Sequence, residues 1–183
     1  MIYPEKTVLL KDGSECLLRS PDAEDAPAMT EYLVLASAET HFMARQPEEI
    51  DADISREREY LRKLRGDGAG MMIGAFIGGE LAGNCSFAAV RELKKLRHRA
   101  AFGIAVKSAF WGWGIGGLLL DESVTQAGAM GFYQLELGVY ADNERARALY
   151  LKHGFEEWGV TKNAYLLPDG EYIDEILMGR VLR

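Results

Sequence analysis

A glycine-rich segment near the middle of the chain has a composition suited to binding phosphate. Residues 110–119 read Phe-Trp-Gly-Trp-Gly-Ile-Gly-Gly-Leu-Leu, with glycines at 112, 114, 116 and 117 between a strand-like and a helix-like stretch. Glycine has no Cβ atom, so backbone N–H groups can converge on an anion, and the N-terminus of the following helix adds partial positive charge. The segment therefore predicts a polyphosphate site, with a tight turn of purely structural use as the alternative.

Two well-known glycine motifs can be compared with this segment. A P-loop is excluded, because no Gly-Lys-Ser or Gly-Lys-Thr follows the glycines. A dinucleotide-binding turn is harder to exclude, since Glu136 lies 24 residues after Gly112 and can imitate the ribose-binding acid. Against it, residues 107–111 separate the strand from the first glycine, and Glu136 lies in mid-strand. Glycine spacing alone leaves the choice open.

A second segment, residues 142–155, is expected to form a short helix with a ligand-facing side. Asp142 or Asn143 can cap it and Gly154 can end it. Asn143, Ala146, Arg147 and Tyr150 recur at helical spacing on one face. Asn143 and Tyr150 can thus address one ligand, although a tyrosine at such a position also fits core packing.

The surrounding pattern predicts how these segments are held. Asp12-Gly13 separates two short apolar runs and predicts an opening hairpin, a first helix follows Ser20-Pro21-Asp22, and a second is expected after Pro47. Three antiparallel strands are expected at residues 71–77, 80–90 and 99–106, with Gly78-Gly79 as a turn.

The second half of the chain predicts a change in strand direction. A helix at 118–129, a strand at 133–140 and the helix at 143–153 require a right-handed crossover with parallel pairing, and 165–168 with 172–181 form a closing hairpin around Asp169-Gly170. We therefore expect one α/β domain over residues 1–183. Its mixed sheet would have antiparallel strands at both ends, parallel strands in the middle and about four flanking helices.

Composition narrows the class of protein further. The chain has 183 residues and a net charge of −7, which argues against nucleic acid as a main partner, because phosphate neutralisation needs clustered Lys and Arg. Cys16 and Cys85 are expected to be small core residues rather than a disulfide or metal site. No apolar run is long enough for a membrane helix and no signal pattern is present, so a cytoplasmic location is the default expectation.

Taken together, the two segments resemble the paired cofactor motifs of the GNAT superfamily of acetyl-CoA-dependent N-acetyltransferases. The resemblance rests on Val106-x5-Gly-x-Gly-Ile-Gly followed by Leu-Glu-Leu-x-Val, Asn143, Ala146, Leu149-Tyr150 and Gly154-Phe155, about 50 residues in all. It extends in order over Asp12-Gly13, Glu39-Thr40, His98-Arg99 and the closing hairpin. The whole pattern is similar to bacterial enzymes that acetylate amino acids or other small amines.

The resemblance implies a role for each matching residue. The strand matching 101–106 would splay from the strand matching 135–139, and the pantetheine arm of acetyl-CoA would lie in the opening. Pantetheine would pair with the backbone of Ile104, Ala105 and Val106, while Asn143, beside Ala146, would hydrogen-bond it. The pyrophosphate would be held by Trp111, Gly112, Trp113, Gly114, Ile115, Gly116 and Gly117. No metal is implied.

The implied reaction is direct attack of a neutral amine on the thioester. The Val106 N–H would polarise the thioester carbonyl, and Tyr150 would protonate the departing thiolate, since a tyrosine hydroxyl with a pKa of about 10 keeps its proton at neutral pH. Many relatives carry a glutamate on the central strand that deprotonates the amine, but residues 101–105 contain none. Glu136, Glu39 and His98 are the candidates for this base, and each also fits an ordinary surface or cap role.

We therefore expect transfer of acetyl from acetyl-CoA to a primary amine of a small molecule. The alternatives are acetylation of a protein N-terminus or lysine, a CoA-binding regulatory module without turnover, and a nucleotide-dependent oxidoreductase. The sequence identifies neither the acceptor nor the oligomeric state, for which a homodimer is a common default.

Overall fold

The computed structural model describes residues 1–51, 53–66 and 68–182. Within these ranges the chain forms eight strands, four α-helices and three short 3-10 helices. The helices are α1 (Ala26–Glu39), α2 (Ile54–Gly66), α3 (Ile115–Ala129) and α4 (Glu144–Lys152), with η1 (Ala23–Asp25), η2 (Pro47–Glu49) and η3 (Ser108–Phe110). The strands are β1 (Lys6–Leu9), β2 (Glu15–Arg19), β3 (Gly70–Ile77), β4 (Glu80–Ala89), β5 (Arg99–Val106), β6 (Gln134–Tyr140), β7 (Glu156–Leu166) and β8 (Tyr172–Val181).

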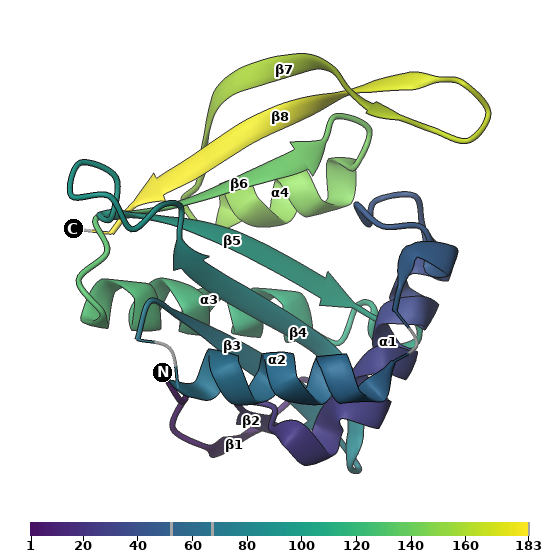
Figure 1. Cartoon of the computed structure of the whole chain (residues 1–183), viewed down its shortest axis with the longest axis vertical. Coiled ribbons are helices and arrows are strands. Elements are labelled where there is room, and N and C mark those ends of the chain that lie inside the picture. The colour runs from purple at the N-terminus through teal and green to yellow at the C-terminus, as the bar shows by residue number, and fades with distance from the viewer. Residues whose placement is uncertain (52, 67, 183) are drawn as a thin grey trace. The chain divides into compact units, whose positions relative to one another are not determined.

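The strands belong to one mixed sheet in the order β1-β2-β3-β4-β5-β6-β8-β7 (Figure 1). Neighbours from β1 to β4 pair antiparallel, as do β6 with β8 and β8 with β7. The pairing of β5 with β6 is parallel and runs from Arg99 opposite Gln134 to Ala101 opposite Glu136. This arrangement confirms the α/β fold class, the antiparallel ends, the central parallel pair and the four helices.

The chain divides into two compact units, each of which has its own buried interior. The first comprises residues 1–88 and 103–123, and it contains α1, α2 and the strands β1 to β3. Its core includes a cluster in which both helices contribute apolar side chains, namely Ala26, Met29, Tyr32, Ala36, Leu61, Met72, Phe76 and Leu81. The face of α1 that this unit buries carries Ala26, Met29, Tyr32 and Ala36, which recur at helical spacing.

The predicted hairpin turns are present with the backbone geometry that their residues favour. Gly13 has φ of 87°, and the Asp12 carboxylate accepts hydrogen bonds from the N–H and hydroxyl of Ser14. Gly78 and Gly79 also have positive φ between β3 and β4. Only glycine adopts this region without steric cost, so these residues determine where the strands reverse.

The second helix begins later than the sequence pattern predicts. Pro47 starts only the short turn η2, and α2 begins at Ile54. Of the apolar residues expected in its buried stripe, Leu61 is buried and Leu64 is half-buried, whereas Ile54 is 39% exposed. The expected start was wrong because proline at a first helical position fits a 3-10 turn as well as an α-helix.

The second unit comprises residues 89–102 and 124–183, including β6, β7, β8 and α4. Phe155 follows α4 and lies against Tyr150 and Phe102, with ring centroids 5.9 and 6.5 Å apart. The closing hairpin was predicted too short, because β7 starts at Glu156 and not at Tyr165. The β7–β8 hairpin is the long two-stranded ribbon drawn in yellow-green and yellow (Figure 1).

Both cysteines are buried, as expected for core residues. Among the described residues, no helix has the length and apolar character required to cross a membrane.

The packing of α2 makes a stability prediction. Leu61 is 1% exposed in the core of the first unit, while its neighbour Arg62 is exposed. Leu61→Ala leaves a cavity and should lower the free energy of unfolding by about 2–5 kcal/mol, whereas Arg62→Ala should change it by less than about 0.5 kcal/mol. Urea denaturation of the two variants measures the difference, and equal midpoints would show that α2 does not seal this core.

Candidate functional site

The glycine-rich loop connects η3 to α3 in the first unit and has two left-handed residues. Gly112 has φ of 87° and Gly114 has φ of 90°. The helix α3 begins at Ile115, three residues before the predicted start, so Gly116 and Gly117 belong to its first turn rather than to the loop. The N–H groups in the first turn of a helix have no acceptor within the helix, so those of Gly116 and Gly117 are available to an acceptor from outside it.

The hydrogen bonds of this loop leave a group of donors without acceptors. The Trp111 N–H donates to the Ser108 carbonyl at 3.0 Å and the Trp113 N–H to the Phe110 carbonyl at 3.5 Å. Within the part of the chain that the structure describes, no acceptor is found for the N–H groups of Gly112, Gly114, Ile115, Gly116 and Gly117. Unpaired N–H groups at a helix N-terminus form an anion site, so the donors expected from residues 111–117 reduce to these five.

A carboxylate from α1 anchors the start of the loop. Glu39, the last residue of α1, accepts the Ser108 N–H at 2.7 Å and the Ser108 hydroxyl at 2.8 Å. Both carboxylate oxygens are therefore engaged by the first residue of η3. Glu39 acts as a cap for the turn that leads to the glycines, and this contact could not be found from sequence because 69 residues separate the two partners.

Two side chains bind the carbonyl groups at the end of β5. The Tyr32 hydroxyl donates to the Ala105 carbonyl and the Trp111 indole N–H donates to the Val106 carbonyl, both at 2.7 Å. Burial raises the pKa of Tyr32, so this donor keeps its proton. On β4, a Cβ at Gly83 would come within 2.9 Å of the Ala105 carbonyl. Two of the three predicted residues, Ala105 and Val106, are thus held through their carbonyl groups, and Ile104 precedes them on the same strand. A glycine inside a strand was the sequence signal for the close approach of β4 to Ala105.

In the second unit, the predicted helix face on α4 is formed as expected. The Asn143 side-chain carbonyl accepts the Ala146 N–H at 3.1 Å, which makes Asn143 the N-cap. Its oxygen is used by this bond, so the amide NH₂ group is the part that can donate to a ligand. Gly154, with φ of 77°, ends the helix as predicted.

Tyr150 lies near the end of α4 and is nearly buried. Its side chain is 7% exposed and packs against Phe155. Burial raises the pKa of Tyr150 to about 12. Among the described residues no hydrogen bond to its hydroxyl is found, so this group is a protonated donor that a ligand can use.

Glu136 on β6 is held in an ion pair that makes it a poor base. Arg99 donates to its two oxygens at 2.5 and 2.6 Å, and the Gln134 amide donates at 2.9 Å. The hydrogen bond from Arg99 holds the pKa of Glu136 below its usual range. A group that takes a proton from an amine near neutral pH needs a higher pKa, so the geometry argues against Glu136 in that role.

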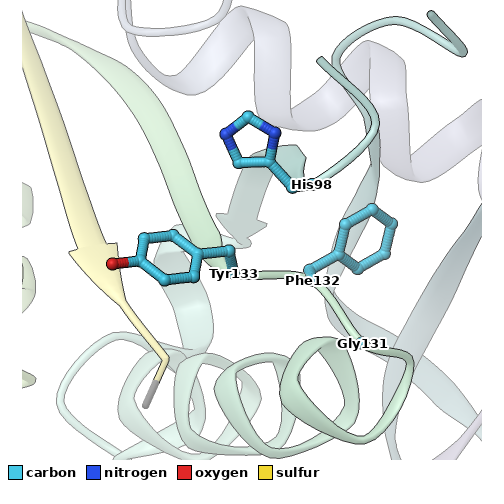
Figure 2. Close-up of a pocket in the computed structure, with 4 residues that line it drawn as sticks. All are labelled: His98, Gly131, Phe132 and Tyr133. Atoms are coloured by element: carbon cyan, nitrogen blue, oxygen red, sulfur yellow. The ribbon is translucent and has the colours of Figure 1, made fainter. Parts of the chain in front are cut away.

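His98 lies at an open hollow in the second unit (Figure 2). Its ring faces Tyr133 edge-on at 6.2 Å, and Gly131 and Phe132 complete the lining. His98 precedes β5 and Tyr133 precedes β6, so the hollow is at the N-terminal ends of the two parallel strands. Ligand sites in parallel sheets lie beyond the carboxyl ends of the strands, and the hollow is therefore separate from the predicted site. Across the described residues, no cluster of three or more His, Cys, Asp or Glu side chains suited to a metal ion is found.

The sequence-predicted site residues thus fall into two groups. The glycine loop and the end of β5 belong to the first unit, with Tyr32 and Glu39 as supports that the sequence did not reveal. Asn143, Ala146 and Tyr150 share α4 in the second unit. Each group by itself offers donors to an anionic or carbonyl-bearing ligand.

A mixed sheet with a glycine-rich loop before α3 and a capped helix before β7 defines an α/β protein with a candidate anion site at the N-terminus of α3. A family model agrees: residues 31–155 match the acetyltransferase (GNAT) family. The chain belongs to this family. The match includes the glycine loop, the end of β5 and all of α4.

Individual relatives are consistent with that assignment. The L-amino acid N-acetyltransferase AaaT of Escherichia coli is 34% identical over 58% of this chain and 65% of its own length. The chain thus matches less than two thirds of this curated relative. An acetyltransferase of the GNAT family from Streptococcus pneumoniae has a solved structure with a TM-score of 0.86, 30% identity, and coverage of 91% of this chain and 99% of its own.

A third likeness concerns the fold alone. A phosphinothricin acetyltransferase from Sinorhizobium meliloti, solved in complex with acetyl-CoA, superposes with a TM-score of 0.79 at 23% identity over 91% of this chain and 88% of its own.

The loop geometry predicts that glycine is required at position 114 for ligand binding and not only for folding. Gly114→Ala forces a side chain into the left-handed region, at a cost of about 1–3 kcal/mol, and puts a methyl group into the open space that a bound phosphate would need. Gly13→Ala is the matched control, because Gly13 has φ of 87° against 90° and neither added Cβ would have a neighbour within 4 Å.

Both variants should lose similar stability in thermal melts, while only Gly114→Ala should lose affinity for CoA in calorimetric titration. Equal CoA affinity in the two variants would show that the phosphate site lies elsewhere than in this loop.

Proposed function

We propose that this protein transfers the acetyl group of acetyl-CoA to a primary amine of a small molecule, by direct attack in a ternary complex. The observation that carries the proposal is the set of five N–H groups without acceptors around Gly112 and Gly114, at the N-terminus of α3. Such a donor set matches a pyrophosphate, which is the charged centre of CoA. Family membership supports the same ligand.

In this proposal the cofactor is bound by both groups of residues. The pyrophosphate would lie on the N–H groups of residues 112 and 114–117. The pantetheine arm would pair with β5, using N–H groups or the Ile104 carbonyl, because the Ala105 and Val106 carbonyls already accept Tyr32 and Trp111. The Asn143 amide would donate to the same arm beside Ala146. Acetyl-CoA in the Sinorhizobium meliloti relative supports this choice of cofactor.

The proposed chemistry needs three functions from the protein. The amine attacks the thioester carbonyl, and the oxyanion that forms is stabilised by a backbone donor, for which we propose the Val106 N–H. The C–S bond then breaks, and Tyr150 would give its proton to the departing thiolate. Glu136 and Glu39 are held by Arg99 and Ser108, so we assign neither as the base that takes the proton from the amine.

Several wider expectations belong to the same proposal. We propose that residues 1–183 form a single N-acetyltransferase domain, which is supported by a family match that includes parts of both units. Cytoplasmic location and a homodimer remain predictions. Acetylation of a protein N-terminus or lysine, and CoA binding without turnover, are the alternatives that the acceptor experiment separates.

The cofactor and the reaction can be tested together. Calorimetric titration should give binding of acetyl-CoA and none of NADH, because NADH has a pyrophosphate but lacks the pantetheine arm that is proposed to pair with β5. An acceptor panel with detection of the released thiol should then show turnover on small primary amines. Selective binding of NADH would overturn the proposed acetyl transfer. Turnover on peptides alone would change the acceptor from a small molecule to a protein. Binding of acetyl-CoA without turnover on any acceptor would indicate a regulatory module.

Tyr150 makes the most specific catalytic prediction. Tyr150→Phe removes the proton and almost no volume, so kcat should fall about 10²–10⁴-fold, equivalent to about 3–5 kcal/mol, if thiolate departure limits the rate. The affinity for acetyl-CoA should change much less. Since burial raises the pKa of Tyr150 to about 12, loss of this proton should not lower the wild-type rate at neutral or mildly alkaline pH.

Steady-state kinetics on an established acceptor, with thermal melting as the check on folding, measures these effects. Equal kcat at equal stability would return Tyr150 to a packing role beside Phe155.

A further inference from the structure

A glycine in the middle of β6 makes room for a carboxylate. Gly138 is exposed. Two residues further along β6, Tyr140 lies opposite Glu175 of β8 in the strand register. A Cβ at position 138 would overlap the Glu175 carboxylate. The carboxylate therefore lies directly on the β6 backbone, at a place where a glycine inside a strand commonly marks the close approach of another group.

A pair of stacked tyrosines lies at one side of this carboxylate, and one of them binds it. The rings of Tyr140 and Tyr165 stack at 3.7 Å with 8° between their planes. The Tyr165 hydroxyl donates to Glu175 Oε1 at 2.8 Å. For Oε2 no partner is found among the described residues, which leaves it as an acceptor beside two aromatic rings.

A bulge in β7 brings Tyr165 to this position. Thr161 pairs with Glu175 and Tyr165 with Ile173, so residues 162–164 stand opposite Asp174 alone. Asp174 accepts the Asn163 N–H at 2.9 Å and the Lys162 ammonium at 2.7 Å, and Asn163 has φ of 53°. Lys162 is thus paired with Asp174 and not with Glu175, so the Glu175 carboxylate can bind another cation. Bulges of this kind re-aim side chains next to functional sites.

Apolar side chains continue the same face of the sheet. Leu177 lies opposite Gly138 and is 40% exposed. Further along β8, the Trp158 ring covers Gly179, where a Cβ would overlap it, and Trp158 is 45% exposed. A carboxylate next to exposed aliphatic and aromatic surface fits a ligand with one cationic end and one apolar end.

We propose that Glu175 binds the ammonium group of the acceptor, and that Leu177 and Trp158 contact its apolar substituent. The acceptor class is therefore a primary amine with an apolar side group. This inference rests on the proposed acetyl transfer and adds the acceptor to it. The carboxylate binds the amine in its charged form, the ammonium then gives one proton to solvent water, and the neutral amine attacks the thioester carbonyl with its lone pair.

The test compares Glu175→Gln with Glu171→Gln. Glutamine at 175 can still accept the Tyr165 hydroxyl, while the control removes the same charge from the exposed turn of the same hairpin. Phenethylamine is the probe and 2-phenylethanol its uncharged partner. Calorimetry should show binding of phenethylamine to the wild type and the Glu171→Gln variant. Binding to Glu175→Gln should be weaker by about tenfold or more, since a hydrogen-bonded charge is lost.

Kinetics distinguishes this inference from the proposed function. Glu175→Gln should raise KM for phenethylamine by about tenfold, with a smaller change in kcat and unchanged affinity for acetyl-CoA. If neither the wild type nor any variant turns over, the proposed acetyl transfer is wrong. Calorimetry with phenethylamine would then still test whether Glu175 binds the amine. Turnover with equal KM in wild type and Glu175→Gln would overturn the assignment of Glu175.

Two further variants complete the test. Gly138→Ala keeps Glu175 but displaces its carboxylate, so it should weaken phenethylamine binding without weakening that of acetyl-CoA. Leu177→Asp should leave the sedimentation behaviour of the protein unchanged. If it instead dissociates a dimer, a second copy covers this face and the acceptor assignment is overturned. Equal binding of 2-phenylethanol and phenethylamine would overturn it as well.

Discussion

The candidate site depends on one backbone constraint, the left-handed conformation of Gly112 and Gly114, in a loop where five N–H groups have no acceptor in the described chain. A side chain at either position would be strained, and a conventional turn would pair these donors internally. The cost of five unpaired donors is limited because they are at the start of a helix, where such groups are unpaired in any case and can be solvated. An anionic ligand can therefore accept hydrogen bonds from N–H groups that the loop leaves unpaired.

The residues that support this loop have no chemistry of their own in the proposed reaction. Glu39 ties the end of α1 to η3, and Tyr32 ties the middle of α1 to the end of β5. Met29 and Ala36 pack one face of α1 into the core of the first unit. Because Glu39 and Tyr32 of the same helix bind the loop and the end of β5, the packing of that core helps to position the loop. A carboxylate and a phenol that sequence reasoning treats as a candidate base and a core residue therefore act as positioning groups.

The parts of the fold that sequence predicts well are those with strong local signals. The turns at Gly13, Gly78 and Gly170, the cap at Asn143 and the stop at Gly154 each have a residue whose backbone preference decides the structure. The start of β7 could not be read in this way. Residues 156–164 are largely exposed and contain charged residues, a glycine and an asparagine, so no alternation of apolar side chains indicates a strand. The strand exists because β8 supplies its hydrogen-bonding partner, which is information from the tertiary structure.

The bulge at residues 162–164 has a consequence for how this hairpin can change. The ladder runs from Glu156 to Thr161 with one register shift at Trp158, and after the bulge at residues 162–164 pairing resumes at Tyr165. An insertion or deletion inside the bulge would therefore be absorbed locally, without moving either end of the ladder by one register. It would alter the contacts of Lys162 and Asn163 with Asp174, while Tyr165 keeps its place opposite Ile173, its stacking on Tyr140 and its hydrogen bond to Glu175. Chain length at this one point can thus vary without a change in the register that positions Tyr165.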